Sequence, residues 1–199
     1  MKIAVFLLSA TPVLAQIITY TKSFPGSTPA WVEISVQESG EAVYKEDPKD
    51  ELPIRFTVTE TDRAMLRNLA EKLDKFSRPL ESPAKVAKMG MKTLRYEKDG
   101  ERHETKFNYS EDLDARALQD WFERVIETEQ ERNQLERMAR YEKLGVEDAL
   151  LRIEVSWDRK RLVAPEQFLP LLDRITKNDS YMHMARSRAA GLAEHIRER

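Results

Sequence analysis

The sequence predicts an α+β protein in which an antiparallel sheet of about five strands packs with helices and is followed by a C-terminal helical bundle. Three observations support this class. Most segments up to residue 109 alternate apolar and polar residues between turns, residues 111–144 have the pattern of one long amphipathic helix, and the remainder has only helical periodicity. Strands followed by helices are typical of α+β folds. We therefore expect a sheet domain over residues 17–126 and a helical subdomain over residues 127–199, which share the long helix.

The first fifteen residues, 1–15, have the pattern of a secretory signal peptide. Lys2 precedes an apolar run, and the small residues Val13 and Ala15 occupy the −3 and −1 positions that a signal peptidase recognises. We therefore expect cleavage after Ala15 and a mature protein that is secreted or periplasmic, in a bacterium. A buried N-terminal strand or helix and an uncleaved anchor are the alternatives. The apolar run is shorter than the roughly 20 residues that span a membrane, so no transmembrane segment is expected in the mature chain.

The segments before residue 59 have the alternation of strands joined by turns. Residues 17–22 alternate weakly, which suggests an edge strand. Residues 31–37 alternate cleanly, with two valines and an isoleucine on one face, and residues 42–45 return as the hairpin partner. The apolar residues of segment 54–58 mark the inward face of a further strand.

A helix and a second hairpin follow. Thr59, with Asp62 three residues later, has the pattern of a capping box at the start of a helix. The apolar face of that helix ends before two prolines, which prevent its continuation. Asp99-Gly100 then lies between two alternating segments, residues 91–98 and 102–109, and is a strong signal for a tight hairpin turn.

Three segments, WVEISVQESGEAVY, TETDRAMLRNLAEKLDKF and MKTLRYEKDGERHETKFNYS, therefore follow one another as hairpin, strand, helix and hairpin. This layout resembles small α+β domains of unknown function in secreted bacterial proteins. The resemblance covers about half of the chain and leaves the C-terminal helices unmatched. It implies a fold and no particular activity.

The long helix over residues 111–144 is expected to connect the two parts. Ser110 is placed to cap its first turn, and Gly145 is placed to end it in the left-handed conformation. Its apolar face is formed by Leu118, Trp121, Phe122, Val125 and Ile126. This face lapses over residues 127–134 and resumes at Leu135, so we expect one end to pack on the sheet and the other on helices, with a hydrated middle. The alternative, a coiled-coil dimer, requires an apolar seam without such a break.

Three further helices are predicted in the C-terminal part. The first covers residues 146–159, and the second begins at Pro165, with Pro170 placed to kink it. The third has Asp179 or Ser180 as its cap. Together with the end of the long helix, they are expected to form a small antiparallel bundle.

No constellation in the sequence identifies a catalytic, cofactor or metal site. The chain has no cysteine, which excludes disulfides and thiol chemistry. Its three histidines, His103, His183 and His195, lack the spacing that places two metal ligands on one helix face. The glycine-rich phosphate-binding motifs and the nucleophile elbow are absent as well. We therefore predict no catalytic residue, no cofactor and no metal.

The charge of the chain is distributed unevenly. Residues 159–199 contain nine basic and five acidic residues, whereas residues 16–158 carry a net charge of −7. The basic residues either meet an anionic partner, such as lipid headgroups or cell-wall polymers, or neutralise the acidic part of the same chain. Trp31, expected opposite the apolar face of its strand, marks a possible binding edge. The candidate binding surface is Trp31, Arg159, Lys160, Arg161, Arg186 and Arg188.

These observations favour a non-enzymatic secreted or periplasmic interaction module that acts through the sheet edge or through the junction between the two parts. The expected partner is a protein or another envelope component, and not nucleic acid, because no nucleic-acid-binding signature is present. A hydrolase-like cell-envelope enzyme, whose site is assembled only in three dimensions, is the first alternative. A helix-mediated homodimer with a structural role is the second.

Overall fold

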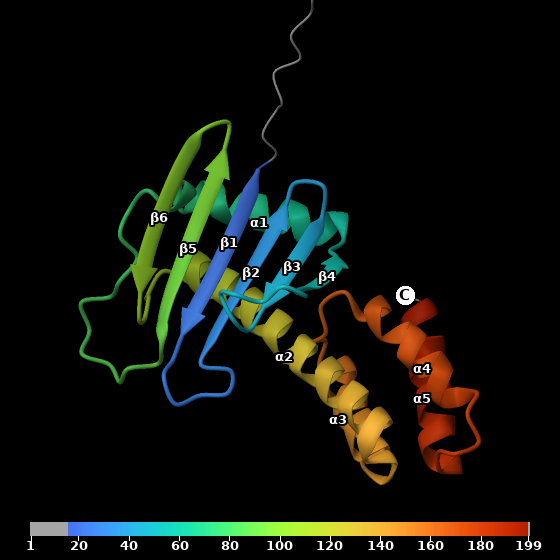
Figure 1. The fold of residues 1–199 in the computed structure, drawn as a ribbon. Coiled ribbons are helices and arrows are strands. Elements are labelled where there is room, and N and C mark those ends of the chain that lie inside the picture. Colours follow the sequence, from blue (N-terminus) through green and yellow to red (C-terminus); the bar gives the residue numbers. More distant parts are fainter. Residues whose placement is uncertain (1–15, 199) are drawn as a thin grey trace, which may run out of the picture.

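A computed structural model describes residues 16–198 and confirms the predicted α+β class. Within these residues the chain forms six strands and five α-helices, with three short 3₁₀ helices between them. The sheet thus has one strand more than the expected five. Two of the helices, α1 and α2, lie on one face of the sheet, and α2 continues past the sheet into the C-terminal helices (Figure 1).

The six strands form one antiparallel sheet with the order β4-β3-β2-β1-β5-β6. Both predicted hairpins are present, β2 with β3 and β5 with β6, and the second turns at Asp99 and Gly100, which have φ angles of 50° and 84°. The strands are β1 (Ile17–Ser23), β2 (Trp31–Gln37), β3 (Glu41–Lys45), β4 (Ile54–Thr57), β5 (Met91–Lys98) and β6 (Glu101–Phe107).

Strand β1 lies in the centre of the sheet, so its expected position at an edge is wrong. It pairs with β2 on one side and with β5 on the other along its full length. Its alternation is weak because Tyr20 and Lys22 share the helix-covered face with Ile18. The Tyr20 hydroxyl donates to Glu123 Oε1 at 2.9 Å, and the Lys22 amine lies 2.7 Å from Glu123 Oε2. The hydroxyl of Tyr20 and the amine of Lys22 therefore have a hydrogen-bond partner on α2 and do not depend on water for one.

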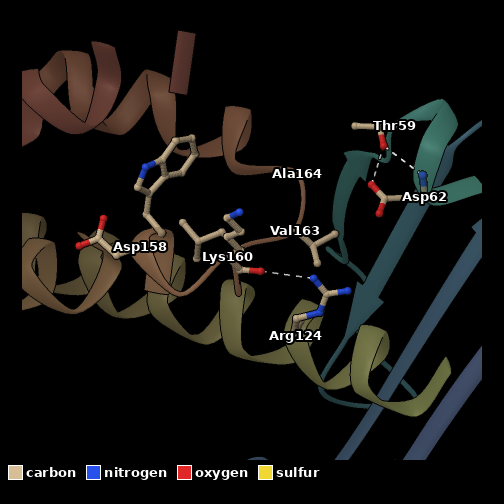
Figure 2. Close-up of a pocket in the computed structure, with 9 residues that line it drawn as sticks. Thr59, Asp62, Arg124, Asp158, Lys160, Val163 and Ala164 are labelled. Carbon is tan, nitrogen blue, oxygen red and sulfur yellow. Dashed lines mark hydrogen bonds between the residues drawn. The ribbon is translucent and has the colours of Figure 1, made fainter. Parts of the chain in front are cut away.

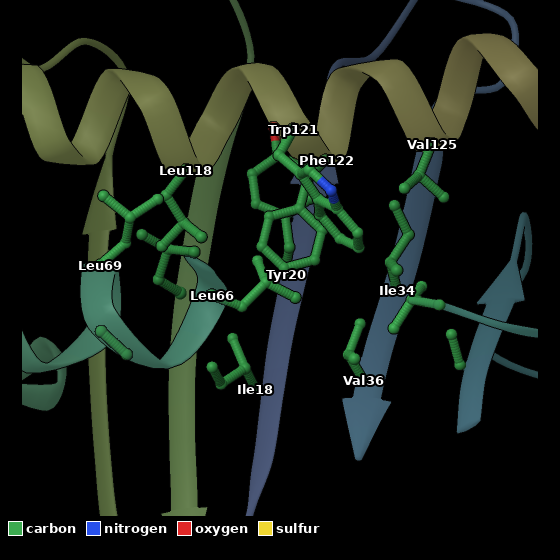
Figure 3. Close-up of a cluster of buried hydrophobic side chains, with 14 of the residues drawn as sticks. Ile18, Tyr20, Ile34, Val36, Leu66, Leu69, Leu118, Trp121, Phe122 and Val125 are labelled. Atoms are coloured by element: carbon green, nitrogen blue, oxygen red, sulfur yellow. The ribbon is translucent and has the colours of Figure 1, made fainter. Parts of the chain in front are cut away.

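The first core lies between the sheet and the helices α1 (Glu60–Lys72) and α2 (Leu113–Tyr141). The five apolar residues predicted for the first half of the long helix are all buried there, and Figure 3 shows Leu118, Trp121, Phe122 and Val125 among them. Phe122 stacks on Tyr20 with ring centroids 4.8 Å apart and meets Trp121 edge-on at 5.0 Å. Aromatic rings in these geometries attract each other beyond their area burial. They fix α2 against the middle of the sheet.

Helix α1 begins as predicted. Thr59 Oγ1 accepts a hydrogen bond from the backbone nitrogen of Asp62 at 3.1 Å, and the Thr59 hydroxyl donates to Asp62 Oδ2 at 2.7 Å. The other carboxylate oxygen of Asp62 accepts from Nε1 of the buried Trp121 at 2.9 Å. The cap of α1 therefore also ties α1 to α2.

Both ends of the long helix differ from the prediction. Asp112, and not Ser110, is the N-cap, because its carboxylate accepts from the backbone nitrogens of Asp114 and Ala115. The carboxylate also pairs with Arg78, which lowers the pKa of Asp112. The helix ends at Tyr141, and Gly145 lies in a short 3₁₀ helix (Lys143–Gly145) with right-handed backbone angles.

The polar sequence of residues 127–134 predicted a hydrated middle for α2. The structure shows that this stretch is only partly hydrated. Thr128 and Glu129 are both completely buried. Trp121 and Leu135, on either side of this stretch, belong to two separate apolar clusters. The two cores are thus separated along α2 by buried polar side chains.

The second core is formed by the end of α2 and by three further helices, α3 (Val146–Asp158), α4 (Leu169–Thr176) and α5 (His183–Arg197). The helix expected from Pro165 is divided into a 3₁₀ helix (Pro165–Phe168) and α4, and Pro170 lies in the first turn of α4, where proline is compatible with helical geometry. Neither Asp179 nor Ser180 caps α5. Met182 precedes the helix and provides no side-chain cap.

The predicted signal peptide, residues 1–15, lies outside the described residues. From residue 16 to residue 198, no helix combines the length and the apolar character that crossing a membrane requires.

Candidate functional site

A short connection between α3 and the 3₁₀ helix Pro165–Phe168, residues 159–164, links the two cores. We call it the strap. Leu162 belongs to the core of the bundle, whereas Val163 and Ala164 are buried in the core of the sheet. The strap therefore passes from one core to the other beside the middle of α2. Residues 163 and 164 pack with the sheet although the sequence analysis assigned them to the helical part.

The strap begins with a Schellman motif that ends α3. The backbone nitrogen of Arg161 donates to the Ser156 carbonyl at 2.9 Å, and that of Lys160 donates to the Trp157 carbonyl at 2.8 Å. Lys160 has a φ of 56° and Ala164 a φ of 48°, both in the left-handed region that favours glycine. Two residues of a six-residue connection thus have an unfavourable backbone conformation. Such strain persists only where the surrounding structure imposes it, and it is concentrated at functional sites.

Thr128 on α2 holds the strap in place. Its hydroxyl donates to the Arg124 carbonyl at 2.8 Å and accepts from the backbone nitrogen of Val163 at 3.1 Å. The second bond is buried, so it satisfies a donor that water does not reach. One threonine in the polar stretch of α2 therefore fixes the distance between the strap and the helix.

Arg161, in the predicted binding surface, attaches the strap to α2 from the outside. Its guanidinium donates twice to Glu127 at 2.8 Å and once to Asp120 at 2.9 Å. These hydrogen bonds raise the pKa of Arg161 above its ordinary value. Arg161 of the strap thus neutralises acidic residues of α2. This agrees with the interpretation that the basic residues neutralise the acidic part of the same chain.

A cleft of about 610 Å³ opens where the strap, α2 and the start of α1 meet (Figure 2). Ligand sites in proteins are typically clefts of roughly 300–1,000 Å³, with a mainly apolar lining and a few convergent polar groups. This cleft combines apolar side chains with two carboxylates and two cationic groups. Its lining residues are Thr59, Asp62, Arg124, Trp157, Asp158, Lys160, Leu162, Val163 and Ala164.

The polar groups of the cleft differ in how many hydrogen bonds they already make within the protein. Both carboxylate oxygens of Asp62 accept hydrogen bonds, one from Thr59 and one from Trp121. Arg124, by contrast, makes one long hydrogen bond within residues 16–198, from Nη1 to the Lys160 carbonyl at 3.4 Å. The Lys160 side chain is exposed. The cationic groups are therefore the ones with donors left for a ligand.

The structure brings few of the predicted site residues together. Lys160 lines the cleft, and exposed Arg159 adjoins it in the chain. Arg186 and Arg188 lie on α5 and form ion pairs within the bundle, Arg186 with Asp179 and Arg188 with Glu147 and Glu154. Trp31 is half-buried on the sheet face opposite the helices.

Arg124 and Trp157 are cleft residues that the sequence analysis did not select. Trp157 was assigned to the core of the bundle, and it does pack against that core while also lining the cleft. Arg124 lies between the apolar positions of α2 and looks like an ordinary solvated residue of an amphipathic helix. A signal was present in the lapse of the apolar face at residues 127–134, which marks the place where another segment crosses.

Glu129, next to Thr128 on α2, has a buried carboxylate whose hydrogen bonding is incomplete. Glu129 Oε2 accepts from Arg132 Nε at 3.2 Å, whereas Glu129 Oε1 has no hydrogen-bond partner in the described part of the chain. Burial raises the pKa of Glu129, since removing the carboxylate from water penalises its charged form. Glu129 is not among the residues that line the cleft.

The chain matches no protein-family model, and no curated protein matches it. Over the described residues, 16–198, no three histidine, aspartate or glutamate side chains are grouped closely enough to hold a metal ion.

Proposed function

We propose that this protein is a non-enzymatic binding module, secreted or periplasmic, whose ligand occupies the cleft between the strap, α2 and the start of α1. The observation that supports the proposal most is the cleft itself, which has about 610 Å³ and lies at the junction of two cores. Ligand sites are found preferentially at such junctions. The prediction from sequence named the same junction as one of two places for binding.

The local structure of the strap supports the proposal. The left-handed backbone of Lys160 belongs to the Schellman motif that ends α3, whereas that of Ala164 is not part of this motif. Three kinds of contact hold the strap in place, namely the Thr128 hydrogen bond, the Arg161 ion pairs and the burial of Val163 in the sheet core. The fold stabilises one particular course of the strap, and that course forms one wall of the cleft.

The hydrogen bonds that Asp62 already accepts favour a binding module over a hydrolase. A general acid or base needs a carboxylate oxygen within hydrogen-bond reach of the substrate, and hydrogen bonds within the protein compete for that oxygen. Both oxygens of this carboxylate already accept hydrogen bonds from Thr59 and Trp121 and serve to cap α1. A cell-envelope enzyme remains the alternative proposal, and it would have to use Asp158, which is exposed at the other end of the cleft (Figure 2).

Nuclear magnetic resonance of the mature chain tests the proposal. We would titrate the ¹⁵N-labelled protein with 8-anilinonaphthalene-1-sulfonate, an aromatic anion, and follow the Trp157 indole and the backbone amides of Lys160 and Leu162. Saturable shifts at these signals, with the Trp31 indole unchanged, are expected. Shifts that do not saturate, or that are largest at Trp31 or along α5, would contradict a ligand site in the cleft.

A further inference from the structure

Arg124 has more hydrogen-bond donors than the protein uses. A guanidinium carries five N–H donors. In the described part of the chain, the bond of Nη1 to the Lys160 carbonyl, at 3.4 Å, is its only hydrogen bond. Nε is buried and lies 3.3 Å from Asp120 Oδ2 without the geometry of a hydrogen bond. Since the side chain lines the cleft, its remaining donors are available to a ligand (Figure 2).

Two other arginines, one on the strap and one in the bundle, are engaged more completely. Arg161 makes three hydrogen bonds of 2.8–2.9 Å to two carboxylates. Arg188 lies between Glu147 and Glu154 and pairs with both. Arg124 shares Asp120 with Arg161, and the shorter contact belongs to Arg161. Its charge is therefore less fully neutralised by the protein than the charges of these two arginines.

The rest of the cleft has a different chemistry. Trp157 contributes a half-buried indole, and Leu162 and Val163 contribute aliphatic side chains along the strap. An indole face and aliphatic side chains bind a ring or a short alkyl chain through burial of apolar area. The Lys160 side chain also lines the cleft and adds a second positive charge.

We propose that the cleft takes an organic monoanion, in which a carboxylate, sulfonate or phosphodiester group is attached to an apolar or aromatic body. The anionic group binds the free donors of Arg124, with Lys160 beside it, and the apolar body lies against Trp157, Leu162 and Val163. This inference rests on the proposed function, because it names the ligand class of the same cleft.

The two carboxylates of the cleft do not oppose this assignment. Asp62 is in the first turn of α1, where its charge interacts with the positive end of the helix dipole, and its oxygens accept from Thr59 and Trp121. Asp158 comes from the end of α3, on the side of the cleft away from Arg124 (Figure 2). Of the two carboxylates, Asp158 thus lies away from Arg124, and Asp62 already accepts two hydrogen bonds within the protein.

A matched pair of dyes tests the ligand class. N-phenyl-1-naphthylamine has the ring system of 8-anilinonaphthalene-1-sulfonate and lacks its sulfonate. We expect the wild-type protein to bind the sulfonate dye about tenfold or more tightly than the neutral dye, because hydrogen bonds to a charged group contribute about 1.5–3 kcal/mol. Fluorescence titration of both dyes, with one-site binding checked by calorimetry, measures this ratio of dissociation constants.

Substitution of Arg124 assigns the preference to one residue. Arg124→Gln should bring the two dissociation constants to within about threefold of each other, whereas Arg124→Lys should keep most of the preference. Arg137→Gln, an exposed arginine further along the same helix, is the control and should change neither value. Circular dichroism establishes that each variant is folded. If Arg124→Gln does not fold, Lys160→Asn, which tolerates left-handed backbone, should lower the preference in its place.

The outcomes separate this inference from the proposed function. Equal binding of both dyes in the cleft, or a preference for the sulfonate that Arg124→Gln and Lys160→Asn leave intact, overturns the anion assignment and leaves a ligand cleft in place. Absence of saturable binding for both dyes overturns the cleft and the assignment together.

Discussion

The hydroxyl oxygen of Thr128 lies 3.1 Å from the backbone nitrogen of Val163 and joins the middle of the longest helix to the strap that crosses it. The same hydroxyl donates to the Arg124 carbonyl one turn earlier. A threonine hydroxyl that donates back to its own helix keeps its acceptor lone pairs for another partner. Here it also satisfies a buried donor from a segment 35 residues away. The polar stretch of α2 is therefore the place where the strap attaches.

We expect Thr128→Val to lower the free energy of unfolding by about 1–3 kcal/mol, because the valine has the same shape and leaves the Val163 N–H buried without an acceptor. Urea denaturation measures this change. The matched control is Thr176→Val, whose hydroxyl makes the same bond to the carbonyl four residues earlier, that of Leu172, and should cost less than about 0.5 kcal/mol. Equal losses in the two variants would show that the strap contact contributes nothing.

Much of the fold could be predicted because the local patterns agree with the final packing. Strand β2 alternates cleanly since one face is buried and the other is not. Thr59 caps α1 through a bond within one turn. β1 was placed wrongly because Tyr20 and Lys22 reach a glutamate about one hundred residues away. A pattern in one segment cannot indicate a partner at that distance.

Replacing Lys160 by glycine should stabilise the protein by about 0.5–1 kcal/mol. Left-handed backbone costs a residue with a side chain about 1–2 kcal/mol, and glycine avoids this cost. Part of the gain is lost because glycine makes the unfolded chain more flexible. Thermal unfolding followed by circular dichroism measures the change. Lys177→Gly at the end of α4, where φ is −86°, is the control and should be neutral or destabilising. A loss of stability in Lys160→Gly would mean that the lysine side chain contributes more than its backbone strain costs.

The free energy of unfolding should depend on pH through Glu129. Its carboxyl titrates near 4.5 in the unfolded chain, and burial raises its pKa in the folded protein. Between these two values the folded state binds more protons than the unfolded state, so stability falls as pH rises through this window. Glu129→Gln should therefore be more stable than wild type at pH 7, and this advantage should shrink as pH falls from the raised folded pKa toward 4.5, the unfolded value.

Urea denaturation at several pH values tests this dependence. Glu136→Gln is the control, because Glu136 lies on the same helix, pairs with Arg140 and is only partly buried. It should slightly lower stability at pH 7. A Glu129→Gln variant less stable than wild type at neutral pH would show that the Arg132 contact outweighs the cost of burying the charge.

The candidate site was harder to predict than the fold. The junction was anticipated from the break in the apolar face of α2, but Arg124 and Trp157 have no local feature that sets them apart from the other polar and apolar residues of their helices. They become cleft residues only through the course of the strap. That course depends on Thr128, Arg161 and the burial of Val163 together.

Arg161→Gln should reduce stability by about 1 kcal/mol or less, because all three residues of this network are partly exposed and exposed ion pairs contribute about 0.2–1 kcal/mol each. The difference from wild type should shrink at high salt, where exposed charges are screened. Denaturation at low and high sodium chloride measures it. Arg159→Gln, the exposed neighbour, should change nothing. Weaker binding of the sulfonate dye by Arg161→Gln would instead make this arginine part of the site.

The bond between Asp62 and the Trp121 indole should couple the start of α1 to the core of the sheet. Asp62→Ala removes both the partner of the buried indole N–H, 2.9 Å away, and a residue of the helix cap, so we expect a loss of about 2–4 kcal/mol. Trp121→Phe removes the N–H and part of the buried ring, and is expected to cost a similar amount.

A double-mutant cycle separates this bond from the cap and from the ring. If the bond acts as the geometry indicates, the loss in the double variant should be smaller than the sum of the two single losses by about 1–2 kcal/mol, since the second substitution no longer breaks a bond. Additive losses would assign the whole effect of Asp62 to its cap, with Thr59 as the partner that matters. In that case α1 would be held on α2 by apolar contacts alone, and the wall of the cleft formed by α1 would be less rigid than its hydrogen bonds suggest.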